Sequence, residues 1–250
     1  MRVSIVMPAY NERSRIVEAV SRALEAGSRA GLDTEVVVVD DGSTDGTGDV
    51  VEAAGVGGGR VRLVRYGVNM GKGYAVRRGV EASTGDYVVF MDSDGEVDPE
   101  ELRRYVRGLG GSDVCVGSKW HPESRVQAPV VRRMLSRVFH ILVRLLTGVQ
   151  CSDTQAGMKA FRRDALLRIA RLQLVKKYAF DVELLAVASL LKLRIREMPV
   201  KILLRSGFRR REIMRMLVDL MGIVYRLRVI RWYQQNLKIQ EPKYRPIIRL

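Results

Sequence analysis

Short apolar runs alternate with amphipathic segments along the first 120 residues of the chain. The runs are continuous, which is typical of strands that are buried on both faces of a parallel sheet. They lie at residues 3–7, 35–39, 61–64, 86–91 and 113–117. The segments between them carry apolar residues at helical spacing and predict helices over 12–26, 71–82 and 99–109. The pattern predicts an α/β fold with a mainly parallel central sheet flanked by helices.

Longer helices replace this rhythm after Lys119. Over 130–146 the polar residues form one narrow stripe on an otherwise apolar helix, and a last helix over 212–237 carries a similar stripe. Wide apolar faces edged by arginine suit helices that lie in the interface of an anionic bilayer. The alternative is that both helices pack on the sheet or on a second subunit. Further elements are expected at 164–170 and 180–191 (helices) and 193–202 (strands, broken at Pro199).

The charge of the chain is concentrated near its end. Lys and Arg outnumber Asp and Glu by 43 to 28, which gives a net charge of +15, and residues 201–250 alone contribute +10. Such an excess predicts an anionic partner, either a nucleic acid or a membrane surface. Two cysteines exclude a disulfide framework and a zinc cluster. No signal peptide and no run of about 18 apolar residues is recognisable, so we expect a peripheral protein without a transmembrane helix.

Carboxylates follow three of the predicted strands. Glu12 follows the first, Asp40 and Asp41 follow the second, and Asp92 with Asp94 follows the run YVVFM. In a parallel sheet the carboxyl ends of the strands form the edge at which ligands bind. Two carboxylates one residue apart suit a hard divalent cation on a nucleotide diphosphate. The alternative is that DSDGEVDPE is only an acidic turn, in which Asp98 caps the helix that begins near Pro99.

Taken together, the short motifs of the chain resemble the family 2 glycosyltransferases of GT-A fold. Among these they look most like the enzymes that make dolichyl-phosphate mannose and dolichyl-phosphate glucose. The resemblance covers residues 3–210 and rests on MPAYNE, VVVDDGSTDGT, NMGKGYAVRRG, GDYVVFMDSDGEVDPE, VGSKW, DTQAGMKAFRR and YAFDVELL. It implies that 1–118 bind the nucleotide sugar and that 119–205 form the acceptor half of the same domain. Residues 206–250 would supply a basic loop and an amphipathic interfacial helix.

The resemblance also implies roles for individual residues. The donor nucleotide sugar would be held by Pro8, Tyr10, Glu12, Asp40, Lys72, Asp92 and Asp94. Mg²⁺ or Mn²⁺ would be bound by Asp92, Asp94 and Glu96, although mannosyl-transferring members commonly have Gln at the position of Glu96. The acceptor phosphate would be held by Lys119, Arg132 and Arg205, with Lys119 standing where relatives often have Arg. Catalysis would fall to Asp94, Asp153 and Arg205, the last in a basic loop that closes over the diphosphate.

The function implied by the resemblance is inverting transfer of a hexose to dolichyl or polyprenyl phosphate at the cytoplasmic face of a membrane. The donor would be GDP-mannose or UDP-glucose. A phosphate monoester is largely dianionic at neutral pH, because its second pKa is about 6, and it needs no general base. A sugar nucleotidyltransferase is the alternative enzyme, but PAYNERSR lacks the glycine-rich basic loop expected there. A nucleic-acid-binding protein fits the charge, whereas the few aromatics and the acidic sheet edge disfavour it.

Overall fold

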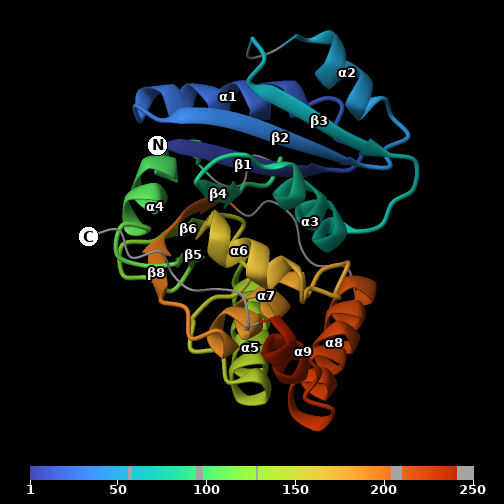
Figure 1. Cartoon of the computed structure of the whole chain (residues 1–250), viewed down its shortest axis with the longest axis vertical. Coiled ribbons are helices and arrows are strands. Elements are labelled where there is room, and N and C mark those ends of the chain that lie inside the picture. The colour runs from blue at the N-terminus through green and yellow to red at the C-terminus, as the bar shows by residue number, and fades with distance from the viewer. Residues whose placement is uncertain (56–57, 94–97, 128, 204–209, 241–250) are drawn as a thin grey trace.

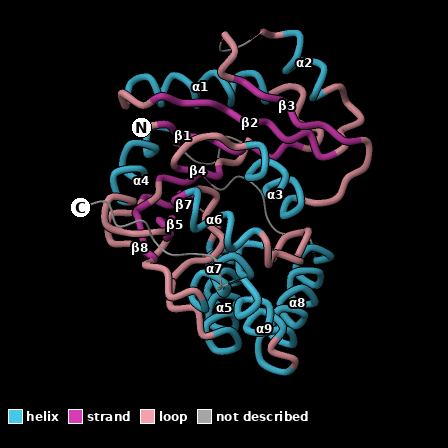
Figure 2. Tube along the Cα trace, viewed as in Figure 1, coloured by secondary structure: helices cyan, strands magenta, loops and turns pink. Residues whose placement is uncertain are grey.

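The computed structural model describes residues 1–55, 58–93, 98–127, 129–203 and 210–240 (Figure 1). Within these ranges the side chains of residues 131, 132, 203, 210–212 and 238–240 are not described. Figure 2 shows the strands in the upper and middle part of the molecule and most of the C-terminal helices below them.

A seven-stranded sheet forms the centre of the fold. In spatial order its strands are β3 (Val61–Tyr66), β2 (Asp33–Asp41), β1 (Arg2–Ala9), β4 (Tyr87–Phe90), β7 (Lys159–Arg162), β5 (Val114–Ser118) and β8 (Ile195–Pro199). All neighbours are parallel except β7, which runs antiparallel to β4 and β5. The predicted mainly parallel sheet is therefore confirmed, with one reversed strand that the sequence pattern did not indicate. Strands β6 (Arg125–Gln127) and β9 (Lys201–Leu203) form a separate parallel pair.

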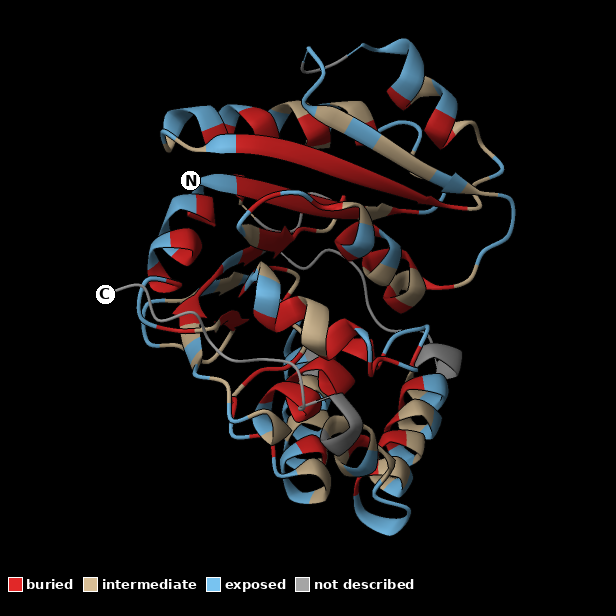
Figure 3. Cartoon of the chain, in the orientation of Figure 1, coloured by how far each residue is buried: buried red, intermediate tan, exposed pale blue. Residues whose placement is uncertain are grey.

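Helices cover both faces of the sheet. Alternate residues of β2 belong to different cores: Val36 and Val38 pack on one face, while Val37 and Val39 pack on the other. The first face is covered by α1 (Ile16–Arg29), α2 (Thr47–Ala53) and α4 (Leu102–Gly108). The second face is covered by α3 (Lys72–Ala82), α6 (Arg163–Ala170) and α7 (Phe180–Leu190). Burial on both faces explains why the strands read as continuous apolar runs, and α7 itself is buried along most of its length (Figure 3).

The turn before α4 resolves part of the ambiguity in the acidic segment. A short 3₁₀ helix, η1 (Pro99–Glu101), leads into α4, and the Asp98 side chain accepts a hydrogen bond from the backbone N–H of Glu100 at 3.1 Å. Asp98 is thus the expected cap.

The C-terminal helices pack beneath the second face. They are α5 (Val130–Thr147), α8 (Arg210–Val224), the π-helix η2 (Tyr225–Val229) and α9 (Trp232–Gln240). The prediction of one continuous helix over 212–237 was wrong, because the chain turns at Arg231, whose φ is +50°. That turn brings the Tyr233 ring into the core, where it is fully buried. Within the described residues, no helix combines the length and apolarity needed to cross a membrane.

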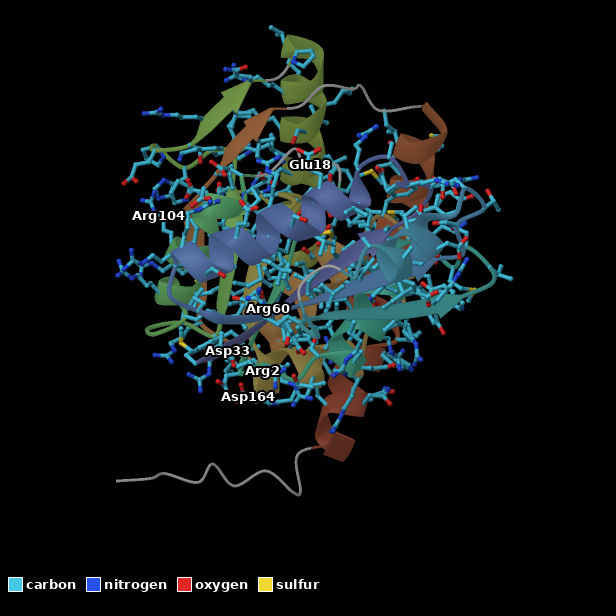
Figure 4. All side chains as sticks on the ribbon, turned by 90° about the horizontal axis from the view of Figure 1, so that it is seen from above. Arg2, Glu18, Asp33, Arg60, Arg104 and Asp164 are labelled. Carbon is cyan, nitrogen blue, oxygen red and sulfur yellow. The ribbon has the colours of Figure 1, made fainter. Side chains whose placement is uncertain are left out.

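The order of the strands determines where a ligand edge forms. Strands β1, β2 and β4 are parallel neighbours, so their carboxyl ends meet at one side of the sheet. Arg2, Asp33 and Arg60 lie where β1, β2 and β3 begin, and their labels in Figure 4 mark the opposite side. Glu12, Asp41 and Asp92, one from each of the three predicted groups of carboxylates, therefore lie at the same edge of the sheet.

Candidate active site

A cavity of about 290 Å³ opens at the carboxyl ends of β1, β2 and β4. The start of α3, the loop before α7 and one residue of α8 complete its wall. The lining residues are Pro8, Ala9, Tyr10, Glu12, Asp41, Asn69, Gly71, Lys72, Ala75, Asp92, Ser93, Lys177, Tyr178 and Arg215. Five predicted donor-binding residues thus share one cavity, namely Pro8, Tyr10, Glu12, Lys72 and Asp92. Its lining contains carboxylates, cations and two exposed tyrosine rings, a composition that suits a nucleotide with phosphates.

The segment after β1 is fixed by the glycine-rich segment that follows β2. The backbone N–H of Asn11 donates to Ser43 Oγ at 3.0 Å, and that of Glu12 donates to Thr47 Oγ1 at 2.9 Å. Asn11 adopts a φ of +55°, and its side-chain oxygen accepts from the backbone N–H of Thr44. The segment 42–49 is therefore more than a turn: it begins α2 and holds Tyr10 and Glu12 at the cavity.

The two adjacent aspartates at the end of β2 have different surroundings. Asp41 lines the cavity, and its carboxylate accepts from Tyr66 Oη at 2.8 Å and from the backbone N–H groups of Met70 and Gly71 at 2.8 and 2.9 Å. Asp40 is fully buried, accepts from the backbone N–H of Ser43 and is not among the described lining residues. The donor role assigned to Asp40 stays a prediction, whereas Asp41, a strand-end carboxylate to which the sequence assigned no separate role, shapes the start of α3.

Gly71 is required where α3 begins. Its φ is +102°, and a Cβ there would lie 2.5 Å from the backbone oxygen of Lys176. Only glycine combines this backbone conformation with such a close approach. At this contact the loop before α7 packs against the first turn of α3, next to Lys72.

Lys72 and Asp92 form an ion pair on the cavity wall. The Lys72 Nζ lies 2.6 and 2.8 Å from the two carboxylate oxygens of Asp92. Both carboxylate oxygens of Asp92 thus point at one cation. The Lys72 side chain is 37% exposed and the Asp92 side chain is 21% exposed. This arrangement fits a divalent cation at the same carboxylate, since hard cations prefer oxygen ligands. The other two predicted ligands, Asp94 and Glu96, lie outside the described residues, and within the described part no group of three metal-binding side chains occurs.

Two further predicted residues meet at the end of β5. The Lys119 Nζ lies 2.9 Å from Asp153 Oδ2, and the pair is almost completely buried. The same carboxylate accepts the backbone N–H groups of Lys119 and Gln155. Burial disfavours the charge of Asp153, but the Lys119 ammonium and the backbone N–H groups of Lys119 and Gln155 together outweigh this effect and hold the pKa of that carboxyl below its usual value. The predicted acceptor ligand Lys119 and the predicted catalytic Asp153 therefore stabilise each other.

We expect Asp153→Asn to lower the free energy of unfolding by about 3 kcal/mol at pH 7, because it leaves a buried ammonium without its anion. Asp153 has a lowered folded-state pKa, so its contribution is complete above the usual value of 3.8 and is lost as the pH falls through the folded-state pKa. Urea unfolding at pH 7 and near pH 3 measures both effects. The exposed Asp164→Asn serves as the control and should cost less than about 1 kcal/mol; equal losses for the two variants would contradict the assignment.

A second buried ion pair lies beneath the cavity. Lys159, 2% exposed, places its Nζ 2.9 Å from Asp181 Oδ1 and 2.7 Å from the backbone oxygen of Ala156. Burial raises the pKa of Asp181, although the ammonium groups of Lys159 and Lys72 oppose this effect. Both residues belong to motifs that carried the resemblance, DTQAGMK and FDVE, but no role was assigned to them from the sequence.

Some predicted site residues cannot be placed. Asp94, Glu96 and Arg205 lie outside the described residues, as does the side chain of Arg132. Three residues that were not predicted from the sequence line the cavity, namely Lys177, Tyr178 and Arg215. The sequence signal for Arg215 was its place in the polar stripe of the last helix. For Lys177 there was none beyond its position just before YAFDVELL.

Comparison with known proteins agrees with this geometry. A family model described as Glycosyl transferase family 2 matches residues 4–169. The human dolichyl-phosphate beta-glucosyltransferase is 34% identical over 80% of this chain, and its Saccharomyces cerevisiae counterpart is 30% identical over 79%. The chain spans 66% of the length of each of these two relatives, slightly less than two thirds.

Solved structures agree on the fold. Glucosyl-3-phosphoglycerate synthase from Mycobacterium tuberculosis, crystallised with Mn²⁺, UDP-glucose and phosphoglyceric acid, superposes with a TM-score of 0.68 over 89% of this chain and 78% of that one. The sequence identity is 24%, so the likeness concerns the fold alone. It confirms the expected GT-A architecture of a mainly parallel sheet flanked by helices.

Proposed function

Because the chain belongs to glycosyl transferase family 2, we propose that it transfers glucose from UDP-glucose to dolichyl or another polyprenyl phosphate. The observation that carries this proposal is the cavity at the carboxyl ends of β1, β2 and β4, which unites Tyr10, Glu12, Lys72 and Asp92. The names of the similar human and yeast proteins favour glucose over mannose. Neither a nucleotidyltransferase nor a nucleic-acid-binding protein would account for both the family match and this cavity.

The reaction needs alignment more than proton transfer. An oxygen of the acceptor phosphate attacks the anomeric carbon of glucose, the bond from that carbon to the diphosphate oxygen breaks, and the electron pair leaves with UDP. Since the phosphate nucleophile is largely dianionic near pH 7, it needs no general base. Among the described residues that line the cavity there is no histidine. The side chains of the chain therefore have to orient two anionic substrates and reduce their mutual repulsion.

A divalent cation would be held by Asp92, with Asp94 and Glu96 of the same segment. Such a cation supplies positive charge that stabilises the leaving diphosphate. The Lys72 ammonium now occupies the position beside Asp92 and would share the negative charge of the donor. Lys119, paired with Asp153, together with Arg132 and Arg205 would hold the acceptor phosphate, as the resemblance implies.

The activity is tested by incubating the protein with radiolabelled UDP-glucose, dolichyl phosphate in detergent and MnCl₂ or MgCl₂. We expect label in an organic-phase product that mild acid hydrolyses back to glucose. The label should stay in the aqueous phase when dolichyl phosphate is omitted or EDTA is added. Organic-phase label that does not depend on dolichyl phosphate would refute the proposed acceptor.

We also propose that helices α5 and α8 dock on an anionic membrane surface. The two helices pack against each other, and a mostly apolar groove of about 130 Å³ lies between them. Apolar side chains of the two helices are exposed over 40% or more of their area, some of them at the rim of this groove, namely Val130, Met134, Leu135, Val138, Ile141 and Leu145 on α5 and Met214, Val218 and Met221 on α8. Exposed arginines of α5 border this face, namely Arg133, Arg137 and Arg144. Apolar side chains rimmed by cations complement a surface of anionic headgroups.

Val138→Glu combined with Val218→Glu is expected to lower co-sedimentation with phosphatidylserine-containing vesicles at least about tenfold, because two apolar anchors become anions. The variant should keep wild-type activity on a short-chain acceptor in detergent. Val68→Glu, at a valine equally exposed on the loop between β3 and α3, is the control. Vesicle binding that survives the double substitution would exclude this face as the docking surface.

A further inference from the structure

The loop that joins α6 to α7 forms one wall of the donor cavity. Lys177 and Tyr178 of this loop line the cavity. The Lys177 stem lies against the start of α3, since a Cβ on Gly71 would come within 2.9 Å of its Cγ. Lys177 therefore stands next to the Lys72–Asp92 pair. Among the residues that the structure describes, Lys177 forms no ion pair; Asp219 acts on it only over a longer distance, so its ammonium can bind an anion in the cavity.

The same loop is tied to the C-terminal helices by Glu183. This glutamate of α7 is fully buried, and its Oε2 accepts the backbone N–H groups of Leu174 and Val175 at 2.9 and 2.7 Å. Its Oε1 accepts from the hydroxyl of Tyr233 in α9 and lies 3.6 Å from Arg226 Nη2. One carboxylate thus joins the middle of the loop to η2 and α9.

The end of the loop lies close to Asp219 of α8, whose carboxylate senses the backbone N–H of Ala179 and the Lys177 ammonium. The Oδ2 of Asp219 is buried and has no hydrogen-bond partner among the described residues, and the Lys177 ammonium lies within its electrostatic reach. One turn before Asp219, Arg215 lines the cavity. Helix α8 therefore both positions Lys177 and carries a second cation at the cavity.

Charge within the cavity shows what these cations can do. Lys72 is compensated by Asp92, and Asp41 is already held by three hydrogen bonds. A diphosphate that enters the cavity needs further cations. Within the described lining these are Lys177 and Arg215, and neither forms an ion pair with a described residue.

We propose that Lys177, together with Arg215, binds the diphosphate of the donor, and that Asp219 and Glu183 are positioning residues that hold Lys177 at the cavity. The inference rests on the proposed nucleotide-sugar donor. It makes the C-terminal helices part of the donor site in addition to their proposed place at the membrane.

Titration calorimetry with UDP in the presence of MnCl₂ tests the role of Lys177. We expect Lys177→Gln to weaken UDP binding about tenfold to a hundredfold, the range for losing one charge-assisted hydrogen bond. Binding of uridine, followed by ligand-observed NMR, should not change. The matched control is Lys176→Gln, because Lys176 is the neighbouring exposed cation and lies over the Tyr74 ring rather than in the cavity lining. Equal UDP affinities for the two variants would overturn the proposal.

The positioning role is tested by a double-mutant cycle. Asp219→Asn and Tyr233→Phe should each weaken UDP binding about threefold to tenfold, and Asp219→Asn should add little once Lys177 is glutamine. A purely structural role predicts full additivity, and additivity would refute the positioning role. If the wild-type protein binds UDP but transfers no glucose, the proposed function fails while the UDP affinities still decide this inference. A wild-type protein that binds no UDP overturns the inference itself.

Discussion

Asp92→Asn is expected to lower glucosyl transfer about 10²- to 10³-fold. The amide keeps the shape of the side chain but removes the charge that would hold a divalent cation, whose stabilisation of a leaving diphosphate amounts to several kcal/mol. The free energy of unfolding should change by less than about 1 kcal/mol, because the Lys72–Asp92 pair is partly exposed. Steady-state rates at saturating UDP-glucose and Mn²⁺ provide the measurement. We expect the same loss for Asp94→Ala, at a position outside the described residues.

The control for this substitution is Asp33→Asn. Asp33 is an exposed aspartate at the start of β2, on the side of the sheet opposite the cavity. The Asp33→Asn protein should transfer glucose at the wild-type rate. An Asp92→Asn protein that is as active as this control would remove Asp92 from the site and with it the proposed metal.

The buried pair beneath the cavity should dominate local stability. Asp181→Ala leaves the almost inaccessible Lys159 without its carboxylate and is expected to lower the free energy of unfolding by about 3–5 kcal/mol. The double substitution Lys159→Met with Asp181→Leu should recover most of that loss, because apolar residues of similar volume can replace a buried ion pair. Urea unfolding of the three proteins measures both steps. A single variant within about 1 kcal/mol of wild type would show that the pair does not stabilise the fold.

Much of the first half of the fold, up to β4, follows from local sequence. The strands before Tyr10, Asp41 and Asp92 were located because each is a continuous apolar run with a polar end. A continuous apolar run does not, however, indicate which of the two neighbouring aspartates, Asp40 or Asp41, faces the cavity. Adjacent residues of a strand point to opposite faces, and a run that is apolar on both faces carries no alternation that would fix the orientation. Packing places Asp41 at the cavity and buries Asp40.

Long-range contacts account for the features that the pattern missed. Strand β7 is four residues long and becomes a strand only because β4 and β5 flank it. The last helix breaks at Arg231 because Tyr233 donates its hydroxyl to Glu183, fifty positions away in sequence. Lys177 lies at the cavity on a loop that Glu183 holds from α7, so no spacing along its own segment could reveal it. Periodicity reports local structure, whereas these residues are placed by tertiary contacts.

The donor identity can be decided in a single reaction that contains dolichyl phosphate, MnCl₂ and equal concentrations of ¹³C₆-glucose-labelled UDP-glucose and unlabelled GDP-mannose. Mass spectrometry of the lipid product separates the two hexoses by six mass units, and NMR of the purified product gives its anomeric configuration. We predict a lipid phosphate that carries ¹³C₆-glucose in β linkage. A product that carries unlabelled mannose, or no lipid-linked hexose at all, would contradict the assignment of the cavity as a UDP-glucose site.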